Sequence, residues 1–404
     1  MQDHEYESLS ALLRTVEPPP SAVDIDAILD AGRRSARRRR VTATAVAAGT
    51  TAVVLFGAFG VAALSRQGGS VPASAASSRA STTPAASSTA IPMPTDPNAA
   101  DCTIQQLPSP AGLLADMLAA DPSGRFQAGQ TEVGDNQGKP VLWTNGVATL
   151  LNAPKAITDS TYNIDAINAS GDLAISTGTS NMTGYRYHDG KFTKLPKLAG
   201  FSSNLPTGIA PNGDIVGSVD SGGSAFAAVI WPADHPGTVR KLATPQGRSA
   251  EAFAIDADGT IGGSLGDGGG PFVWDANGQG HSLKVPSGYH GGKVFSVSGD
   301  WAVGWVGQGD SGRVVGARWN LSTGKVNVYD DQDEAIAVNA NGDFVGSVES
   351  GYLFRDGAFK DLPDPSYGSQ ITPRSISADG KTIAGTAYSA SSKDAASPNV
   401  IWHC

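Results

Sequence analysis

The stretch GIAPNGDIVGSVD at Gly208–Asp220 decides the fold. An Asn-Gly pair stands in its middle, and short apolar runs flank the pair on both sides. Asn followed by Gly favours a tight turn, because both residues adopt positive φ at low cost. Apolar runs joined by such a turn are typical of a β-hairpin. The stretch therefore predicts two antiparallel strands that meet at Gly213.

This pattern occurs seven times between residue 119 and the end of the printed chain. Strong copies begin at Ala254 and Ala337, and weaker ones begin at Ala119, Ala166, Ser296 and Ser375. Consecutive turn glycines are 38 to 47 residues apart, at Gly124, Gly171, Gly213, Gly259, Gly299, Gly342 and Gly380. A period of about 40 to 45 residues is typical of the four-stranded blades of a β-propeller.

Each unit contains four strand-like runs. In the sixth unit we expect strands over 335–338, 344–348, 352–355 and 358–362, with turns at Asn341-Gly342 and Asp356-Gly357. An aromatic residue recurs in the third run, as at Trp143, Trp231 and Trp274. A helical solenoid would need apolar residues at a 3.6-residue period, which these units lack.

The seventh unit supplies three strands, over 374–377, 382–388 and 399–403, and lacks the fourth. A spare strand, Thr103–Pro108, precedes the first unit. If this strand completes the last blade, the ring closes and leaves no exposed sheet edge. The fold class that we predict is all-β: a seven-bladed β-propeller closed by an N-terminal strand in the last blade and preceded by one transmembrane helix.

The chain has two cysteines, and the same closure brings them together. Cys102 immediately precedes the spare strand, and Cys404 ends the strand with which it would pair. Outside the cytoplasm such a pair can oxidise and persist. We predict a Cys102–Cys404 disulfide; two free thiols are the alternative. Two cysteines are too few for a four-thiolate zinc site or a disulfide-rich miniprotein.

The N-terminal hundred residues predict a membrane anchor. Residues 41–64 form a run of 24 residues without a charge, long enough to span a bilayer as a helix. A cleaved signal peptide is the alternative, although its apolar run is normally shorter. An arginine block directly precedes the run and favours a cytoplasmic N-terminus: Arg33, Arg34, Arg37, Arg38, Arg39 and Arg40. Clustered arginines can also neutralise phosphates, but this position makes topology the better explanation, so we expect no nucleic-acid partner.

Four segments follow from these patterns. Residues 1–40 are a predicted cytoplasmic tail and residues 41–64 a transmembrane helix. Residues 65–100 are a linker rich in Ser, Ala and Pro, with too few large apolar side chains to fold. Residues 101–404 are the propeller, with 30 acidic against 20 basic residues, and we expect this domain outside the cell.

The repeated unit, I/V-N-x-x-G-D-x-V-G-S followed by an aromatic strand, resembles the HAF-type repeats of bacterial extracellular proteins. The resemblance is best at Ile167-Asn168, Val338-Asn339 and the triplets Val216–Ser218 and Val345–Ser347; the name-giving His-Ala-Phe triplet is missing. It implies a propeller at the cell surface and no particular reaction. The stretch VDIDAILDAGRRSARRRR also resembles the leaders of actinobacterial single-pass membrane proteins.

Residues that carry chemistry are few. Asp330, Asp331, Asp333 and Glu334 form an acidic cluster that could hold a hard cation or be a solvated loop. Asp256-Ala-Asp258-Gly259 resembles the start of a calcium loop but lacks the later ligands, so a turn explains it better. Trp301 and Trp305 share one strand face, where core packing outweighs a ligand platform. We expect no metal and no cofactor.

Two classes of function remain open. We expect a non-catalytic module that binds an unknown protein or a component of the cell envelope. The alternative is an extracytoplasmic enzyme, a hydrolase or lyase that uses carboxylates near the centre of the ring, because propellers host such chemistry. One blade whose inner strand begins with acids, unlike its siblings, would favour the enzyme, and only 330–334 has this character.

Overall fold

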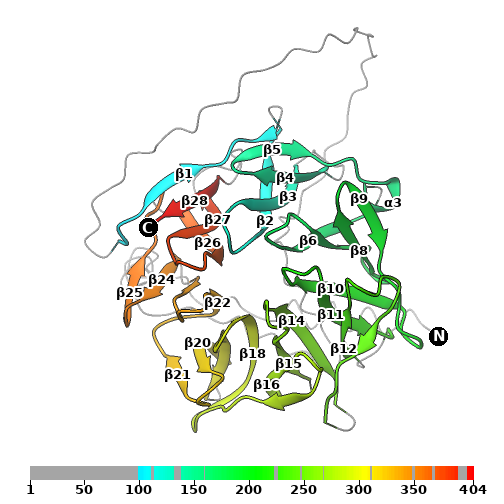
Figure 1. Cartoon of the computed structure of the whole chain (residues 1–404). Coiled ribbons are helices and arrows are strands. Elements are labelled where there is room, and N and C mark those ends of the chain that lie inside the picture. Colours follow the sequence, from blue (N-terminus) through cyan, green and yellow to red (C-terminus); the bar gives the residue numbers. More distant parts are fainter. Residues whose placement is uncertain are drawn as a thin grey trace, which may run out of the picture. The chain divides into compact units, whose positions relative to one another are not determined.

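The computed structural model describes residues 99–110, 113–131, 138–158, 160–222, 226–245, 248–266, 268–309, 312–347, 351–365, 369–389 and 398–404. Within them, seven four-stranded antiparallel sheets stand around one axis as the blades of a propeller (Figure 1). The predicted all-β, seven-bladed fold is confirmed. The predicted tail (1–40), membrane helix (41–64) and arginine block lie outside the described residues.

No helix in the described part of the chain is long and apolar enough to cross a membrane.

In each blade the first strand lies nearest the axis and the fourth lies at the rim (Figure 1). The inner strands are β2 (Ala115–Ala120), β6 (Tyr162–Ile167), β10 (Ser203–Ile209), β14 (Ala250–Ile255), β18 (Tyr289–Ser298), β22 (Ala335–Val338) and β26 (Ser369–Ile376). The second strands are β3 (Phe126–Thr131), β7 (Leu173–Thr177), β11 (Ile215–Asp220), β15 (Ile261–Leu265), β19 (Trp301–Gln308), β23 (Phe344–Gly346) and β27 (Thr382–Ser389).

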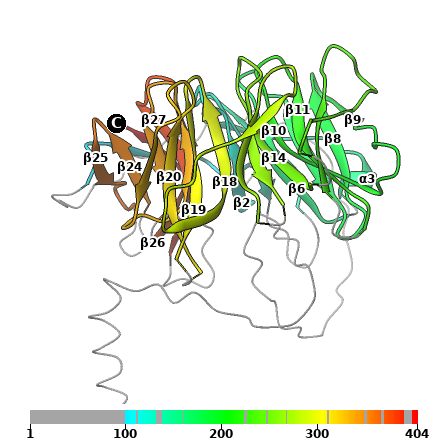
Figure 2. The same ribbon diagram turned by 90° about the horizontal axis from the view of Figure 1, so that it is seen from below.

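The third strands are β4 (Pro140–Thr144), β8 (Thr183–His188), β12 (Phe226–Trp231), β16 (Gly270–Trp274), β20 (Arg313–Asn320), β24 (Tyr352–Arg355) and β28 (Asn399–His403). The outer strands are β5 (Val147–Leu150), β9 (Lys191–Lys194), β13 (Arg240–Lys241), β17 (Gly280–Ser282), β21 (Val326–Tyr329), β25 (Ala358–Asp361) and β1 (Thr103–Gln106). A single helical turn, α3 (Lys155–Thr158), precedes blade 2. Seen edge-on, the strands of all blades run across the thickness of the ring (Figure 2).

The strands predicted for the sixth unit match β22 to β25 within two residues. In the seventh unit, β26 begins at Ser369, five residues before the predicted start. The difference arises because β26 pairs with β27 along its full length, across a bulge between Pro373 and Ser375. Proline in this strand concealed the register from the sequence pattern, since proline is normally kept out of strand interiors.

The ring closes as predicted, by pairing of the first and last described strands. β1 runs antiparallel to β28, with Thr103 opposite His403 (Figure 1). Cys102 and Cys404 form a disulfide across this closure, 302 residues apart in sequence. Just upstream, Ala99 bridges Asp361 of blade 6, and the Ala100 amide donates to the Asp361 carbonyl at 2.7 Å. The last two residues of the predicted linker therefore belong to the folded ring.

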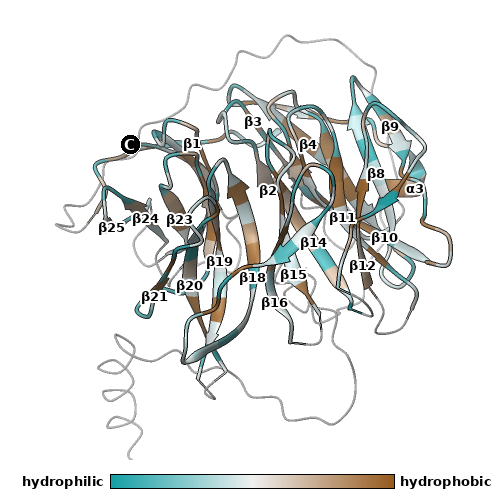
Figure 3. Ribbon diagram, turned by 60° about the horizontal axis from the view of Figure 1, so that its bottom comes forward, coloured by the Kyte–Doolittle hydropathy of each residue, from teal (hydrophilic) through white to brown (hydrophobic). Residues whose placement is uncertain are grey.

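Tryptophans of the third strands connect each blade to the one before it. In five blades of the described ring, the indole Nε1 donates to a backbone carbonyl just beyond the preceding blade's outer strand, at 2.6 to 2.9 Å. The tryptophans are Trp143, Trp231, Trp274, Trp319 and Trp402, each at most 3% exposed. We call these five contacts the tryptophan latches. Strands in the middle of the blades, such as β4 and β11, are largely hydrophobic (brown in Figure 3).

The turns after the inner strands hold the repeated glycines. All seven predicted turn glycines have positive φ, from 55° at Gly299 to 90° at Gly213. Asp256 Oδ1 accepts from the backbone amides of Asp258 and Thr260 at 3.0 and 2.9 Å, and its Oδ2 accepts from the Gly299 amide of the next blade at 3.2 Å. This aspartate is thus a turn cap and a link between blades, which confirms the turn interpretation over a calcium loop.

Candidate functional site

The inner strands present alternate side chains toward the middle of the ring. Along each of them, buried side chains that pack between blades alternate with half-buried ones, as strand geometry requires. Strand register aligns one half-buried position in all seven blades, which we call the axial position. Its occupants, from blade 1 to blade 7, are Asp116, Asn163, Leu205, Glu251, Lys293, Glu334 and Thr372.

Charge at the axial position is concentrated in three consecutive blades. Lys293 of blade 5 lies between Glu251 of blade 4 and Glu334 of blade 6 in the order of the ring. The Lys293 ammonium is 3.3 Å from Glu251 Oε2 and 4.9 Å from the ring centroid of Phe253. Because these side chains are only partly exposed, the pairing is less screened than it would be on the surface. We call Glu251, Lys293 and Glu334 the axial triad.

The carboxyl of Glu334 has a raised pKa. The pKa of its carboxyl is raised to about 7, mainly by burial and also by repulsion from Asp333, while the charge of Lys293 acts to lower it. Its backbone is fixed by Tyr352, whose hydroxyl donates to the carbonyls of Asp333 and Glu334 at 3.3 Å each. A carboxyl with a pKa near neutrality can both donate and accept a proton at physiological pH.

Aromatic side chains surround Lys293. The rings of Phe253 and Phe295, each two residues beyond an axial position, meet edge to face at 5.9 Å. Trp305 stands opposite Lys293 in the β18–β19 register, so the two side chains share one face. Its indole nitrogen is buried without a hydrogen-bond partner among the described residues. In the other blades this cross-strand position holds Gln, Ser or Thr, which makes blade 5 unlike its siblings.

A second carboxyl of unusual character lies on blade 2. Burial raises the pKa of Asp165 to about 7, against hydrogen bonds from Asn163 and Ser176 that lower it. Asn163 Nδ2 donates to Asp165 Oδ1 at 2.6 Å, whereas Oδ2 is buried and has no such partner in the described structure. The sequence analysis missed Asp165. The available signal was an acid inside the otherwise apolar and neutral run YNIDAI, Tyr162–Ile167.

The structure divides the predicted acidic cluster. Asp330 is exposed, and its Oδ1 accepts from the Tyr289 hydroxyl at 2.6 Å and from Gln308 Nε2 at 3.0 Å, both on blade 5. Asp331 is exposed to solvent. Of the four, Asp333 and Glu334 lie directly before the inner strand β22, which begins at Ala335. Among the described residues no three His, Cys, Asp or Glu side chains are arranged to hold a metal ion.

The two tryptophans singled out in the sequence, Trp301 and Trp305, have different surroundings. The guanidinium of Arg318 lies over the ring of Trp301, with its central carbon 4.5 Å from the ring centroid. Arg318 Nη1 also donates to the Gly342 carbonyl of blade 6 at 2.8 Å. Trp301 is therefore an inter-blade packing residue, as expected. Trp305 instead accompanies the axial triad.

Comparisons with known proteins locate the fold. No protein-family model matches the chain, and no curated protein does. Oligogalacturonate lyase from Vibrio parahaemolyticus is similar at a TM-score of 0.53, with 10% identity, over 78% of this chain and 98% of that one. An oligogalacturonate lyase in complex with manganese has a TM-score of 0.53 and 13% identity, over 79% and 98%. A gluconolactonase from Xanthomonas campestris has a TM-score of 0.39 and 15% identity, over 80% and 99%.

The comparisons correct one expectation. The preference for a non-catalytic binding module is wrong, because the two solved propellers with a TM-score of 0.53 are described as lyases. Identity of 10 to 13% establishes a shared fold and leaves the reaction to be argued from this chain's own residues. By fold, the chain is a seven-bladed β-propeller protein.

Proposed function

We propose that this protein is an extracytoplasmic propeller enzyme, a hydrolase or lyase that uses Glu334 as its general acid–base. One observation carries the proposal: Glu334 occupies the axial position, with a pKa raised to about 7, in the blade next to the Lys293–Glu251 ion pair. A carboxyl matched to the working pH, beside a cation and a second carboxylate, is the arrangement that acid–base enzymes use.

Each member of the axial triad has a distinct task in this proposal. Glu334 transfers the proton to or from the substrate. Lys293 stabilises negative charge that develops in the transition state, an effect that is strong where water is partly excluded. Glu251 holds the ammonium group in place at 3.3 Å. Glu251 and Lys293 therefore prepare the field in which Glu334 works.

A carbohydrate is the substrate class that the surroundings favour. Phe253, Phe295 and Trp305 place apolar rings beside the triad. Hydrolysis of a glycosidic bond uses a carboxyl as general acid, and elimination needs a side chain that accepts a proton, which a carboxyl with a pKa near 7 can do. The similarly folded oligogalacturonate lyases support this class. Although one of them was solved with manganese, the described residues here offer no group to hold such an ion, and we derive no step through a metal.

The location of the enzyme is part of the proposal. The arginine block and the uncharged run 41–64 support a single-pass anchor with an internal N-terminus. Residues 65–98 would then be the tether and the ring the external domain. The Cys102–Cys404 disulfide supports an oxidising compartment. The I/V-N-x-x-G-D-x-V-G-S pattern supports membership of the HAF-type extracellular repeat proteins.

The test is the substitution Glu334→Gln in the full chain, assayed on a panel of neutral and acidic polysaccharides. Release of new reducing ends reports either reaction, and ultraviolet absorbance of an unsaturated product identifies a lyase. We expect turnover to fall by about 100-fold or more, the usual contribution of a general acid–base. The wild type should also show a pH–rate inflection near 7 that the variant lacks.

Asp331→Asn is the matched control, because it removes a nearby carboxylate that is exposed. It should leave turnover and the pH profile unchanged. Full activity in Glu334→Gln, or no turnover of any substrate class by the wild type, would refute the proposal.

A further inference from the structure

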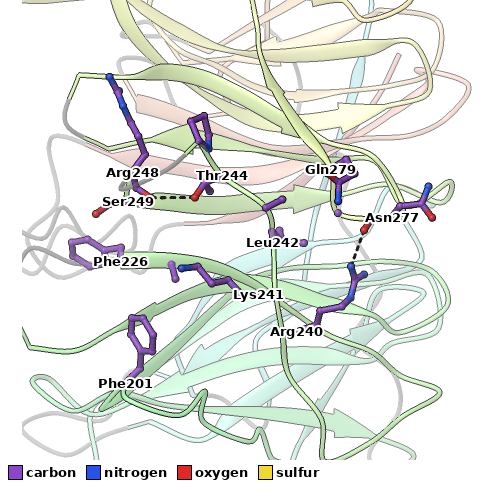
Figure 4. A pocket seen from close by; sticks show the side chains of 14 residues that line it. Phe201, Phe226, Arg240, Lys241, Leu242, Thr244, Arg248, Ser249, Asn277 and Gln279 are labelled. Atoms are coloured by element: carbon purple, nitrogen blue, oxygen red, sulfur yellow. Dashed lines mark hydrogen bonds between the residues drawn. The ribbon is translucent and has the colours of Figure 1, made fainter.

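A groove of about 610 Å³ runs along the outer strand of blade 3, where blade 4 packs against it (Figure 4). Two aromatic side chains, Phe201 and Phe226, lie toward one side, and the amides of Asn277 and Gln279 belong to the turn between β16 and β17. The outer strand β13 has only two residues, Arg240 and Lys241, and so leaves the groove uncovered.

The charge of this groove is opposite to that of the domain. Arg240, Lys241 and Arg248 line it, and none of the other described residues in its lining is acidic. None of the three has a carboxylate within 4.0 Å in the described structure, although acids outnumber bases by 30 to 20 in residues 101–404. Among the described residues these three cations have no paired carboxylate, so they repel one another, and an anionic ligand would relieve that repulsion. We call this surface the basic groove.

The cations are spread along the groove. Arg240 Nη1 donates to the Asn277 carbonyl at 3.0 Å, at the end that faces the β16–β17 turn. Arg248 stands at the other end, where its carbonyl accepts from the Thr244 hydroxyl at 3.2 Å and its Nη1 donates to the Gly266 carbonyl at 3.3 Å. Figure 4 shows Lys241 between them, pointing toward Phe226. An elongated ligand with several negative charges fits this distribution better than one small anion.

The basic groove lies close in sequence to the axial triad. Arg248 and Ser249 precede β14, and Glu251 is the second residue of that strand. Three residues of extended chain span about 10 Å, so the Arg248 end of the groove is near the start of the inner strand. A polymer lying in the groove could therefore continue toward the axis.

We infer that the basic groove binds an acidic polysaccharide, one whose sugars carry carboxylates, and holds it as the substrate of the axial triad. The inference rests on the proposed function and adds the substrate's charge to it. Arginine pairs bidentately with carboxylates. Phe201 and Phe226 offer apolar surface to sugar rings. The proposed extracellular location favours a glycan over a nucleic acid.

The experiment measures binding and keeps it separate from turnover. The full chain carrying Glu334→Gln is titrated with polygalacturonate, and Kd is compared with and without Arg240→Ala plus Arg248→Ala. Removal of both arginines should raise Kd by at least about 10-fold, since hydrogen bonds between charged groups are the strong ones. The pair Lys191→Ala plus Lys194→Ala removes two exposed charges from the outer strand of blade 2 and should leave Kd unchanged.

Several outcomes would overturn the inference. These are an unchanged Kd in the arginine variant, equally tight binding of neutral dextran, or tighter binding of single-stranded DNA than of polygalacturonate. An unchanged melting temperature shows that the arginine variant is folded, and single substitutions replace it if it is not. If the arginine variant binds polygalacturonate more weakly but Glu334→Gln keeps full activity, only the acid–base proposal is refuted. If Glu334→Gln loses activity but the arginine variant binds polygalacturonate as tightly as before, only the inference about the groove is refuted.

Discussion

The rim and the axis of the ring use repetition in opposite ways. Near the rim, the third strands of five blades each carry a tryptophan that donates to the equivalent backbone carbonyl of the preceding blade. At the axial position, seven aligned side chains include acids, a base, an amide, a hydroxyl and an alkyl group. In a chain built from repeats, uniform positions hold the blades together, whereas divergent positions show where one blade has acquired a task of its own.

This comparison assigns stability to the rim and titration to the axis. Variants at the rim should unfold more easily and keep their pH dependence. Variants at the axis should change the response to pH or the turnover, with little cost in stability. The three predictions below test that division, from the largest effect on the free energy of unfolding to the smallest.

Removal of one tryptophan latch should have the largest effect. Trp274 is fully buried, and its indole donates to the Ala243 carbonyl at 2.6 Å. Trp274→Ala leaves a cavity and an unpaired carbonyl, and we expect the free energy of unfolding to fall by about 4 kcal/mol. Chemical denaturation measures this change. A loss below about 1 kcal/mol would show that the latches do not hold the blades, and Trp274→Phe separates the hydrogen bond from the packing.

Opening the closure should cost somewhat less. Cys102→Ser combined with Cys404→Ser removes a crosslink between residues 302 apart, and we expect unfolding to become easier by about 3 kcal/mol. The wild type under reducing conditions is the matched comparison and should behave like the variant. If neither treatment lowers the denaturation midpoint, β1 is held by its strand pairing and packing alone.

The buried carboxyl of Asp165, two residues beyond the axial position of blade 2, should make stability depend on pH with an unusual sign. Asp165 has a pKa raised to about 7 in the folded state, against about 4 in the unfolded chain. Between these values the folded state alone holds the proton, so stability falls as pH rises from 4 to 7. Asp165→Asn cannot titrate. The free energy of unfolding of Asp165→Asn, relative to that of the wild type, should therefore rise by about 2 to 3 kcal/mol from pH 5 to pH 8.

Denaturation at the two pH values checks this prediction, with Asp331→Asn as a control that should follow the wild type. A constant difference between Asp165→Asn and the wild type would mean that Asp165 ionises normally in the folded protein.

The sequence predicted the ring better than the site. Turn glycines such as Gly213 and Gly342 require positive φ, a local demand that a residue type reveals directly. The disulfide followed from the order of the strands alone. The sequence placed Glu334 in an acidic cluster with its neighbours in the chain, residues 330–333. Its structural partner, Lys293, lies 41 residues earlier and reaches it only through the register of two blades.

Asp165 shows the limit more sharply. Its carboxyl is unusual because of what surrounds it: the Asn163 amide, the Ser176 hydroxyl and the loss of water. No single-residue pattern encodes burial of this kind, since the same aspartate on an exposed edge would titrate normally. Properties set by local backbone geometry were predictable, and those set by several blades together were not.

The closure also has a mechanical meaning. A pull on the chain from its N-terminal side passes the contacts of Ala99 and Ala100 with Asp361 and then reaches Cys102, one residue before β1. Four residues of strand pairing could be peeled apart in sequence by such a force, because each hydrogen bond would bear it in turn. The disulfide to Cys404 carries the load across a covalent bond instead, into the end of β28. If the domain is tethered on that side and binds a polymer, as proposed, the disulfide lets it hold that polymer under tension without losing its first strand.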